Sequence, residues 1–259
     1  MKYILYCLIL VLSFINSFAQ NHLSLSEKEF IYLQDKVREQ TNGNIDSAFI
    51  YADRIERSNS FYHKTFAVGA KSYLFQINGD SISSNKFFEK ALYYFSKTPN
   101  SIEKKRLNTF LYTYRGLTYW KRGRLNDALI EYQKGKKISE SINDKIQTIK
   151  FNNNIANINS DVGNFKLAIK SAKESDALTT NIELLYTKNQ FLRNKSNINL
   201  NLGNYYERLY SLNRHKKKYL DSAQFYFEKS ILYSNKQINN KLIAQTNLAN
   251  IFYLKKKLL

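Results

Sequence analysis

The chain has 259 residues, and 40 lysines and arginines against 21 aspartates and glutamates give it a formal net charge of +19 at pH 7. Its 43% hydrophobic content is enough for a continuous core, and a single cysteine excludes a disulfide framework. Lysine outnumbers arginine about three to one, whereas arginine is the better reader of phosphates and bases. We therefore expect no nucleic-acid partner for this segment, while acidic partners or anionic lipid remain compatible with the charge.

Residues 1–19 have the form of a secretory signal peptide. Lys2 gives a short positive start, residues 4–15 are nearly all apolar, and Ser17-Phe18-Ala19 is a small-x-small exit that would leave Gln20 first. The alternative is an uncleaved anchor helix, but the apolar run is shorter than the ~20 residues that span a bilayer. We expect an exported protein that is periplasmic or faces the periplasm.

A glycine followed five residues later by a small residue recurs along the rest of the chain. The small residues step by 36, 44 and 40, and no alternation of period two persists. A period in this range predicts stacked helical hairpins. The pairs are Gly43 and Ala48, Gly79 and Ser84, Gly123 and Ala128, and Gly163 and Ala168. The expected helices cover about 26–41, 44–58, 62–78, 82–97, 102–122, 125–140, 143–162, 165–179, 183–212, 219–235 and 239–256.

The best-formed unit resembles the tetratricopeptide repeat, whose pattern is W-x2-L-G-x2-Y, then A-x3-F, then P. Four positions match, Tyr112 stands for the Trp, Arg115 replaces the Leu, and no proline closes the unit. The resemblance implies an all-α, right-handed superhelical solenoid over residues 20–259, with about five hairpins and the first helix of a sixth, apparently cut mid-repeat. The expected repeat-packing residues are Gly79, Ser84, Gly116, Tyr119, Gly123, Ala128, Tyr132, Ala156, Gly163, Ala168 and Ala223.

The fifth hairpin is irregular, because Ala223 follows Gly203 by 20 residues instead of five. In one interpretation Gly203 is a turn glycine, and residues 206–220 are an insertion of about 15 residues. In the other, Leu202, Gly203 and Tyr206 belong to a long first helix and the insertion is shorter. The sequence leaves both open.

No pattern of catalytic residues stands out. His22, His63 and His215 are far apart and lack Cys or acidic partners at metal-ligand spacing. The chain has no phosphate-binding glycine loop, nucleophile elbow or zincin motif. We therefore expect a protein that is not an enzyme and that uses no metal or cofactor.

The resemblance also points to a binding surface, because in this family the first helices line a concave groove where polar residues three or four apart hold extended peptides. Asparagine both donates and accepts, so it can pair with a peptide backbone, and arginine can hold a carboxylate. The alternative is that asparagine is simply common here. Phe66, Tyr73, Leu117 and Trp120, on the earlier first helices, are interpreted as packing. The expected groove residues are Asn153, Asn157, Arg193, Asn194, Asn197 and Asn250.

The expected function is a non-enzymatic scaffold that binds a protein or an extended peptide, with acidic ligands favoured by the charge. The order of a signal peptide followed by repeats is also similar to the sensing half of some bacterial membrane-spanning regulators. Their effector is an AraC-type or LuxR-type helix-turn-helix or a histidine kinase, and none is present in these residues. Membrane association is expected only through an uncleaved signal segment or a further C-terminal part.

Overall fold

The structure is a computed structural model, and it describes residues 25–214, 216–234 and 238–257. The predicted signal peptide, His22 and His215 lie outside the described residues. The regular elements of the described residues are helices, as the glycine repeat predicts. The chain divides into two compact units, Met1–Lys121 and Arg122–Leu259, which are taken in turn.

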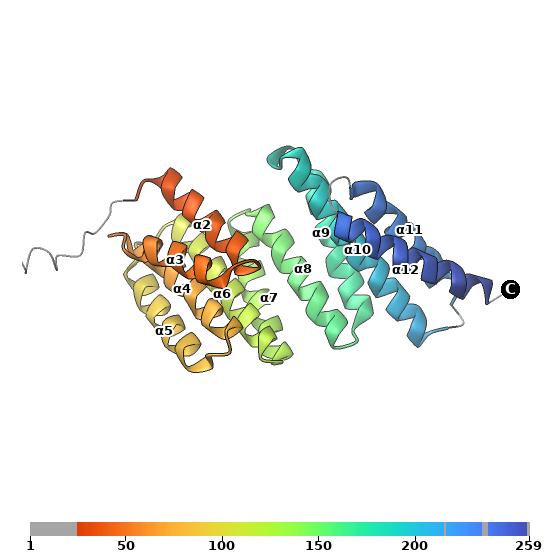
Figure 1. The fold of residues 1–259 in the computed structure, drawn as a ribbon, viewed down its shortest axis with the longest axis horizontal. Coiled ribbons are helices and arrows are strands. Elements are labelled where there is room, and N and C mark those ends of the chain that lie inside the picture. The colour runs from red at the N-terminus through yellow and green to blue at the C-terminus, as the bar shows by residue number, and fades with distance from the viewer. Residues whose placement is uncertain (1–24, 215, 235–237, 258–259) are drawn as a thin grey trace, which may run out of the picture. The chain divides into compact units, whose positions relative to one another are not determined.

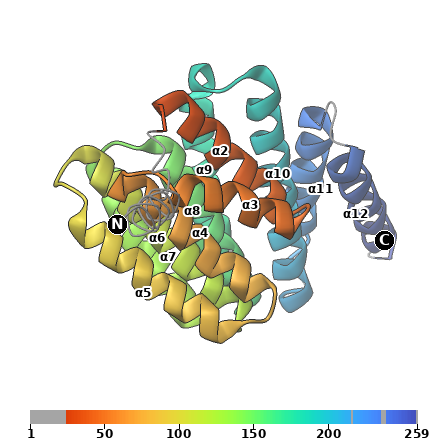
Figure 2. The same ribbon diagram turned by 60° about the vertical axis from the view of Figure 1, so that its left-hand side comes forward.

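The first unit is built from two stacked hairpins and a further helix. Helix α2 (Glu27–Thr41) pairs with α3 (Ile45–Glu56), and α4 (Phe61–Ile77) pairs with α5 (Ser81–Lys97). Helix α4 also packs against α3 and against α6 (Ile102–Lys121). Because α4 contacts both α3 and α5, these three helices lie side by side in Figure 2. The first four helices each begin at a residue whose side chain accepts a bond from a backbone N–H of the first turn.

One buried histidine packs in the core of the first unit. His63 stacks on Phe30, with 4.2 Å between ring centroids, and its Nδ1 lies 2.8 Å from the Ser58 hydroxyl. Burial lowers the pKa of His63, and the charge of Glu27 opposes this only in part. The neutral ring is therefore the form that fits the folded state.

We expect the first unit to lose stability in mild acid. The pKa of His63 is lower in the folded state than in the unfolded state. Its contribution to the free energy of unfolding is therefore fully present above the unfolded pKa of about 6.5, and it declines as the pH falls from there toward the folded pKa. The urea midpoint should drop between about pH 7.5 and pH 5.5. In His63→Gln the drop should shrink, and an unchanged pH dependence in that variant would contradict the assignment.

The second unit continues the same architecture. Its helices are α7 (Leu125–Ser141), α8 (Lys145–Asp161), α9 (Phe165–Asn181), α10 (Lys188–Leu212), α11 (Lys218–Tyr233) and α12 (Ile238–Lys256). Each packs on the next, which makes hairpins of α8 with α9 and of α10 with α11, and α10 also contacts α12. Figure 1 shows α9 to α12 as neighbouring rods in the blue and teal part of the ribbon.

The predicted helix boundaries agree with the structure within a few residues, with one exception. The long helix expected at 183–212 is interrupted, because Glu183–Leu185 forms a short 3-10 turn and α10 begins only at Lys188. Thr187 starts α10 with a capping box, in which its side chain and that of Gln190 satisfy each other's backbone N–H groups.

Three glycines of the predicted packing set act through their backbone instead of through close contacts. Gly79, Gly123 and Gly163 have φ values of 83°, 73° and 81°, and a Cβ added to any of them would meet nothing within 4 Å. They end first helices in the left-handed conformation that favours glycine. Asn143, at φ 54°, takes the same conformation between α7 and α8.

The other predicted packing positions are buried or half-buried. Ala128, Ala168, Ala223 and Tyr132 are fully buried, and Ser84 and Ala156 are nearly so. Gly116 is buried and Tyr119 is half-buried. Gly116 lies on α6 and Ala128 on α7, so the best-formed repeat of the sequence spans the boundary between the two units.

Gly203 decides between the two interpretations of the fifth hairpin. It lies inside α10, and a Cβ there would be closer than 3.0 Å to the ring of Phe227 on α11. Residues 206–212 continue α10 and α11 begins at Lys218, so the insertion of about 15 residues is wrong and the long first helix is right. Gly135 is a second such contact, against Phe151, that the sequence pattern did not indicate.

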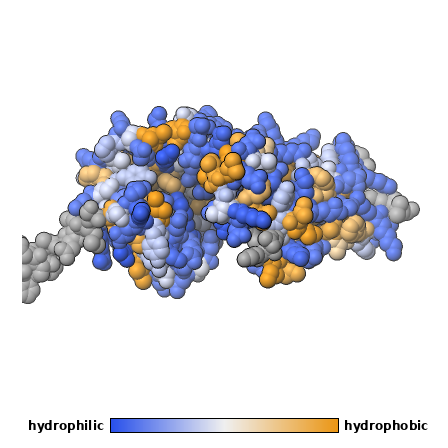
Figure 3. All heavy atoms as spheres, turned by 90° about the horizontal axis from the view of Figure 1, so that it is seen from above, coloured by the Kyte–Doolittle hydropathy of each residue, from blue (hydrophilic) through white to orange (hydrophobic). Residues whose placement is uncertain are grey.

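On the face displayed in Figure 3, hydrophobic side chains occur in small separate groups among hydrophilic ones. No helix among the described residues is both long and apolar enough to cross a membrane.

Candidate functional site

A row of side-chain amides joins α10 to α12 in the second unit. The Asn247 Nδ2 donates to the Asn204 Oδ1 at 2.9 Å, and the Asn250 Nδ2 donates to the Glu207 Oε1 at 2.6 Å. Asn240 donates in the same way to Asn197. All three bonds connect residues 43 apart, so the two first helices lie in register along the row.

The same row extends to α8. The Asn157 Oδ1 accepts a bond from the Tyr205 hydroxyl at 2.5 Å and from the Asn201 Nδ2 at 3.5 Å. Burial raises the pKa of Tyr205, so its hydroxyl keeps its proton and remains a donor. These contacts define the amide row, whose members are Asn157, Asn197, Asn201, Asn204, Tyr205, Glu207, Asn240, Asn247 and Asn250.

Three of the six predicted groove residues belong to this row, namely Asn157, Asn197 and Asn250. Asn153 lies one turn before Asn157 on α8 and is half-exposed. Arg193 is exposed one turn before Asn197, and its side chain makes no hydrogen bond or ion pair with any other residue that the structure describes. Burial raises the pKa of the Tyr186 hydroxyl, and a hydrogen bond with Asn194 opposes the rise.

The sequence interpretation missed the partners within the row. Asn194, Asn197, Asn201 and Asn204 recur at intervals of three and four, which places them on one side of α10. That spacing was a usable signal for the stripe. Local spacing carried no signal for which residues pair, because each bond joins two residues that are more than 40 positions apart in the chain.

Glu207 is the acidic member of the row. Burial raises its pKa, while the bond from Asn250 and the charge of Arg208 act in the opposite direction. Arg208 itself donates to the Ser160 hydroxyl at 3.4 Å, which gives α8 and α10 one more link.

A buried lysine supports α10 behind the row. Lys195 is 4% exposed, its Nζ is paired with Asp176 of α9, and it donates to the Thr180 hydroxyl at 3.0 Å. Asn199 adds a bond to Asp176 at 3.4 Å. These contacts fix the height and rotation of α10 against the preceding hairpin.

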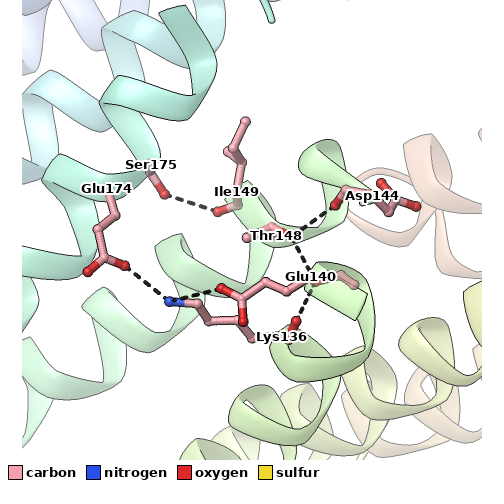
Figure 4. A network of polar contacts seen from close by, with 8 residues as sticks. Lys136, Glu140, Asp144, Thr148, Ile149, Glu174 and Ser175 are labelled. Atoms are coloured by element: carbon pink, nitrogen blue, oxygen red, sulfur yellow. Dashed lines mark hydrogen bonds and ion pairs between the residues drawn. The ribbon is translucent and has the colours of Figure 1, made fainter. Parts of the chain in front are cut away.

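A second polar network holds α7, α8 and α9 together (Figure 4). The Lys136 Nζ lies 3.1 Å from the Glu174 carboxylate, and the Ser175 hydroxyl donates to the Ile149 carbonyl at 3.1 Å. The Ser139 and Thr148 hydroxyls are 2.9 Å apart. Helix α8 is therefore positioned by its two neighbouring second helices, independently of the row.

In the first unit, the first helices of the hairpins carry aromatic side chains instead of a row of amides. Phe66 is buried edge-on against Phe30 and Phe110, and Tyr73 stacks on Tyr114 with centroids 6.4 Å apart. Burial raises the pKa of Tyr114 to about 12. Among the described residues, no group of three or more His, Cys, Asp or Glu side chains is placed to hold a metal.

No protein-family model and no curated protein matches the chain, but solved structures do. BtubC (BKLC) from P. vanneervenii is 18% identical with a TM-score of 0.62, over 86% of this chain and 84% of that chain. A second similar structure is of a P. anserina protein whose TPR-like repeats are nearly identical to one another. It is 12% identical to this chain with a TM-score of 0.53, over 74% of this chain and 86% of that chain. These similarities show the fold of tetratricopeptide-like repeats.

A third similar structure belongs to a larger protein. It is a signal transduction ATPase with numerous domains from Pyrococcus horikoshii, with a tetratricopeptide repeat sensor. The identity is 13% and the TM-score 0.53, over 88% of this chain but only 39% of that chain.

Proposed function

We propose that the second unit is a non-enzymatic scaffold that binds an extended peptide along the amide row. The observation that carries this proposal is the register of the row, in which three first helices present amides to one another at matching heights. Tetratricopeptide-like repeats are compatible with a role in protein interaction, and the row is the part of this chain with the chemistry to hold a peptide backbone.

The amides keep the capacity to bind a ligand while they link the helices. An asparagine side chain carries two N–H donors and an oxygen with two lone pairs, and a single interhelix bond uses only part of this. Packed helices lie about 8–10 Å apart, whereas an extended peptide rises about 3.3 Å per residue. A bound strand crossing the helices would therefore meet a new amide about every third residue, which favours recognition of the backbone.

Charge would add a preference for acidic peptides. Residues 122–259 contain 24 lysines and arginines against 11 aspartates and glutamates. Arg193 is exposed beside the row and can hold a carboxylate. Binding that depends on these charges weakens as salt rises.

We expect Asn153→Ala combined with Arg193→Ala to weaken peptide binding by roughly ten-fold or more, equivalent to about 1.4 kcal/mol. The probe is a peptide selected from a random displayed library on the purified chain, measured by titration calorimetry. These two residues are suitable because they lie beside the row without linking its helices. Lys166→Gln, on α9, is the matched control and should bind normally. Equal affinity in all three proteins would contradict the assigned surface.

The second candidate function is a sensing region. The P. horikoshii similarity favours it, because there the repeats are a sensor within a longer chain. On this proposal the peptide is a signal, and these residues belong to a membrane-spanning regulator of AraC or LuxR type, or to a histidine kinase. The coding DNA that follows residue 259 tests it. A membrane helix leading to such an effector would support it, and a stop codon would count against it.

We propose further that the protein is exported, with residues 1–19 removed. The expected result is a mature chain that begins at Gln20, measured as the intact mass of protein from the periplasmic fraction. A chain that retains Met1 and remains in the cytoplasm would contradict export.

A further inference from the structure

The outward side of α9 is cationic and apolar. Lys166, Leu167, Lys170 and Lys173 are exposed at intervals that place them on one stripe, and Leu167 is 53% exposed. Of the two acidic residues of α9, Asp176 pairs with the buried Lys195, whereas Glu174 lies four residues after Lys170 on the same side of the helix and pairs with Lys136 of α7. The Glu174 side chain is 40% exposed, but its charge is paired with Lys136, so the three lysines leave the stripe with a net positive charge.

Helices α7 and α11, the second helices of the neighbouring hairpins, extend this stripe. The Lys136 contact with Glu174 brings α7 against α9. On the other side, Lys173 lies 5.6 Å from the Tyr206 ring, which stacks on Tyr226 of α11 at 5.5 Å. Tyr206 lies on α10, so side-chain contacts connect α7 directly to α9, and α9 to α11 through α10.

The flanking helices carry further exposed apolar residues with lysines beside them. Ile130 on α7 is 48% exposed, and Phe225 and Leu232 on α11 are 49% and 75% exposed. The Lys229 Nζ lies 4.6 Å from the Phe225 ring centroid. We call this set the outer face, and its members are Ile130, Lys137, Lys166, Leu167, Lys170, Lys173, Phe225, Lys229 and Leu232.

The exposed acids of α7 and α11 do not neutralise the outer face. Glu140 lies 3.7 Å from Lys136, Asp221 pairs with Lys255 at 2.6 Å, and Glu228 accepts a bond from Gln224 at 2.8 Å. Glu140 and Asp221 are thus paired with lysines, whereas Glu228 is bonded to a neutral amide and keeps its charge. The three lysines of the α9 stripe outnumber this carboxylate, so the stripe stays cationic.

A surface of this kind matches the boundary layer of an anionic membrane. Exposed apolar side chains can enter the region between headgroups and acyl chains, and lysines can lie along that layer with their ammonium groups at lipid phosphates. A nucleic acid fits less well, because the cations of the outer face are lysines and a phosphate backbone offers nothing to Leu167, Phe225 or Leu232.

We propose that the outer face docks on a membrane surface that contains anionic phospholipid. The amide row is formed by the first helices, so docking through α7, α9 and α11 uses a different set of side chains. The protein would then present its peptide-binding row while it is held at a membrane, which the proposed function alone does not imply.

Flotation of the full chain with lipid vesicles tests this proposal. We expect binding to vesicles of phosphatidylcholine mixed with phosphatidylglycerol and little binding to phosphatidylcholine alone. The triple variant Lys166→Gln, Lys170→Gln and Lys173→Gln should bind the anionic vesicles at least roughly ten-fold more weakly. The matched control is Lys145→Gln, Lys188→Gln and Lys241→Gln, which changes the net charge equally on the first helices and should bind normally.

A separate variant tests the apolar residues of the outer face. Leu167→Ser with Phe225→Ser should reduce the fraction of binding that survives in high salt, because screening removes only the electrostatic part. Three results would overturn the proposal: equal loss in both triple variants, no loss in either, or binding to duplex DNA without binding to anionic vesicles. Because the N-terminal segment is the same in all variants, its own membrane affinity cancels in the comparison.

Discussion

Replacing Gly203 by alanine is expected to lower the free energy of unfolding of the second unit by about 2 kcal/mol. The added Cβ would lie closer than 3.0 Å to the Phe227 ring, which is itself buried between α10 and α11. Alanine gains about 0.5–1 kcal/mol over glycine in a helix, but this gain is smaller than the cost of the overlap. Chemical denaturation measures the difference.

Two further variants separate the overlap from other effects of the substitution. Gly43→Ala is the control, because its Cβ would meet nothing closer than 3.5 Å, and it should be neutral or slightly stabilising. Phe227→Leu should be less harmful with Gly203→Ala than it is alone, since the smaller side chain makes room. A neutral Gly203→Ala would mean that α10 and α11 do not approach as described.

Replacing Lys195 by methionine is expected to destabilise the second unit by about 2 kcal/mol. Removing one member of a buried ion pair typically costs about 3–5 kcal/mol, and the partner Asp176 remains partly exposed, which reduces that cost. The change also removes the bond to Thr180 and leaves Asn199 as the remaining donor to Asp176. The measurement is the urea midpoint.

The control for Lys195 is Lys188→Met, an exposed lysine about two turns earlier on the same helix, which should change stability little. Adding Asp176→Asn to Lys195→Met should recover part of the loss, because the uncompensated carboxylate is then absent. If both lysine variants melt alike, Lys195 does not support α10 in the way that the contacts indicate.

Much of the fold could be predicted because a glycine follows the first helix of several hairpins in this chain. Gly79, Gly123 and Gly163 have left-handed backbones that other residues rarely adopt, so each one fixes the end of a first helix. Gly203 shows the limit of this reasoning. It is the same residue type used for close approach within a helix, and only the position of Phe227 on α11 distinguishes the two roles.

The candidate site was predictable to the level of the helix face. Asn157, Asn197 and Asn250 were placed on first helices from the repeat register, and the structure brings them into one row. Their partners could not be read from local spacing, because Tyr205 and Glu207 become neighbours of Asn157 and Asn250 only when successive hairpins stack. The outer face was hidden for a similar reason, since its side chains come from three separate helices.

The most direct test of the central claim is to observe the asparagine side-chain amides while a peptide binds. Two-dimensional nuclear magnetic resonance of the nitrogen-labelled chain resolves these amides, and substitutions at Asn157, Asn204 and Asn247 assign them. Addition of the library-selected peptide should shift the amides of the row progressively and leave the backbone signals of α9 residues such as Lys166 and Lys170 in place. Saturable binding that shifts signals of the outer face, or of the first unit, while the amides of the row stay unchanged would contradict a peptide-binding row.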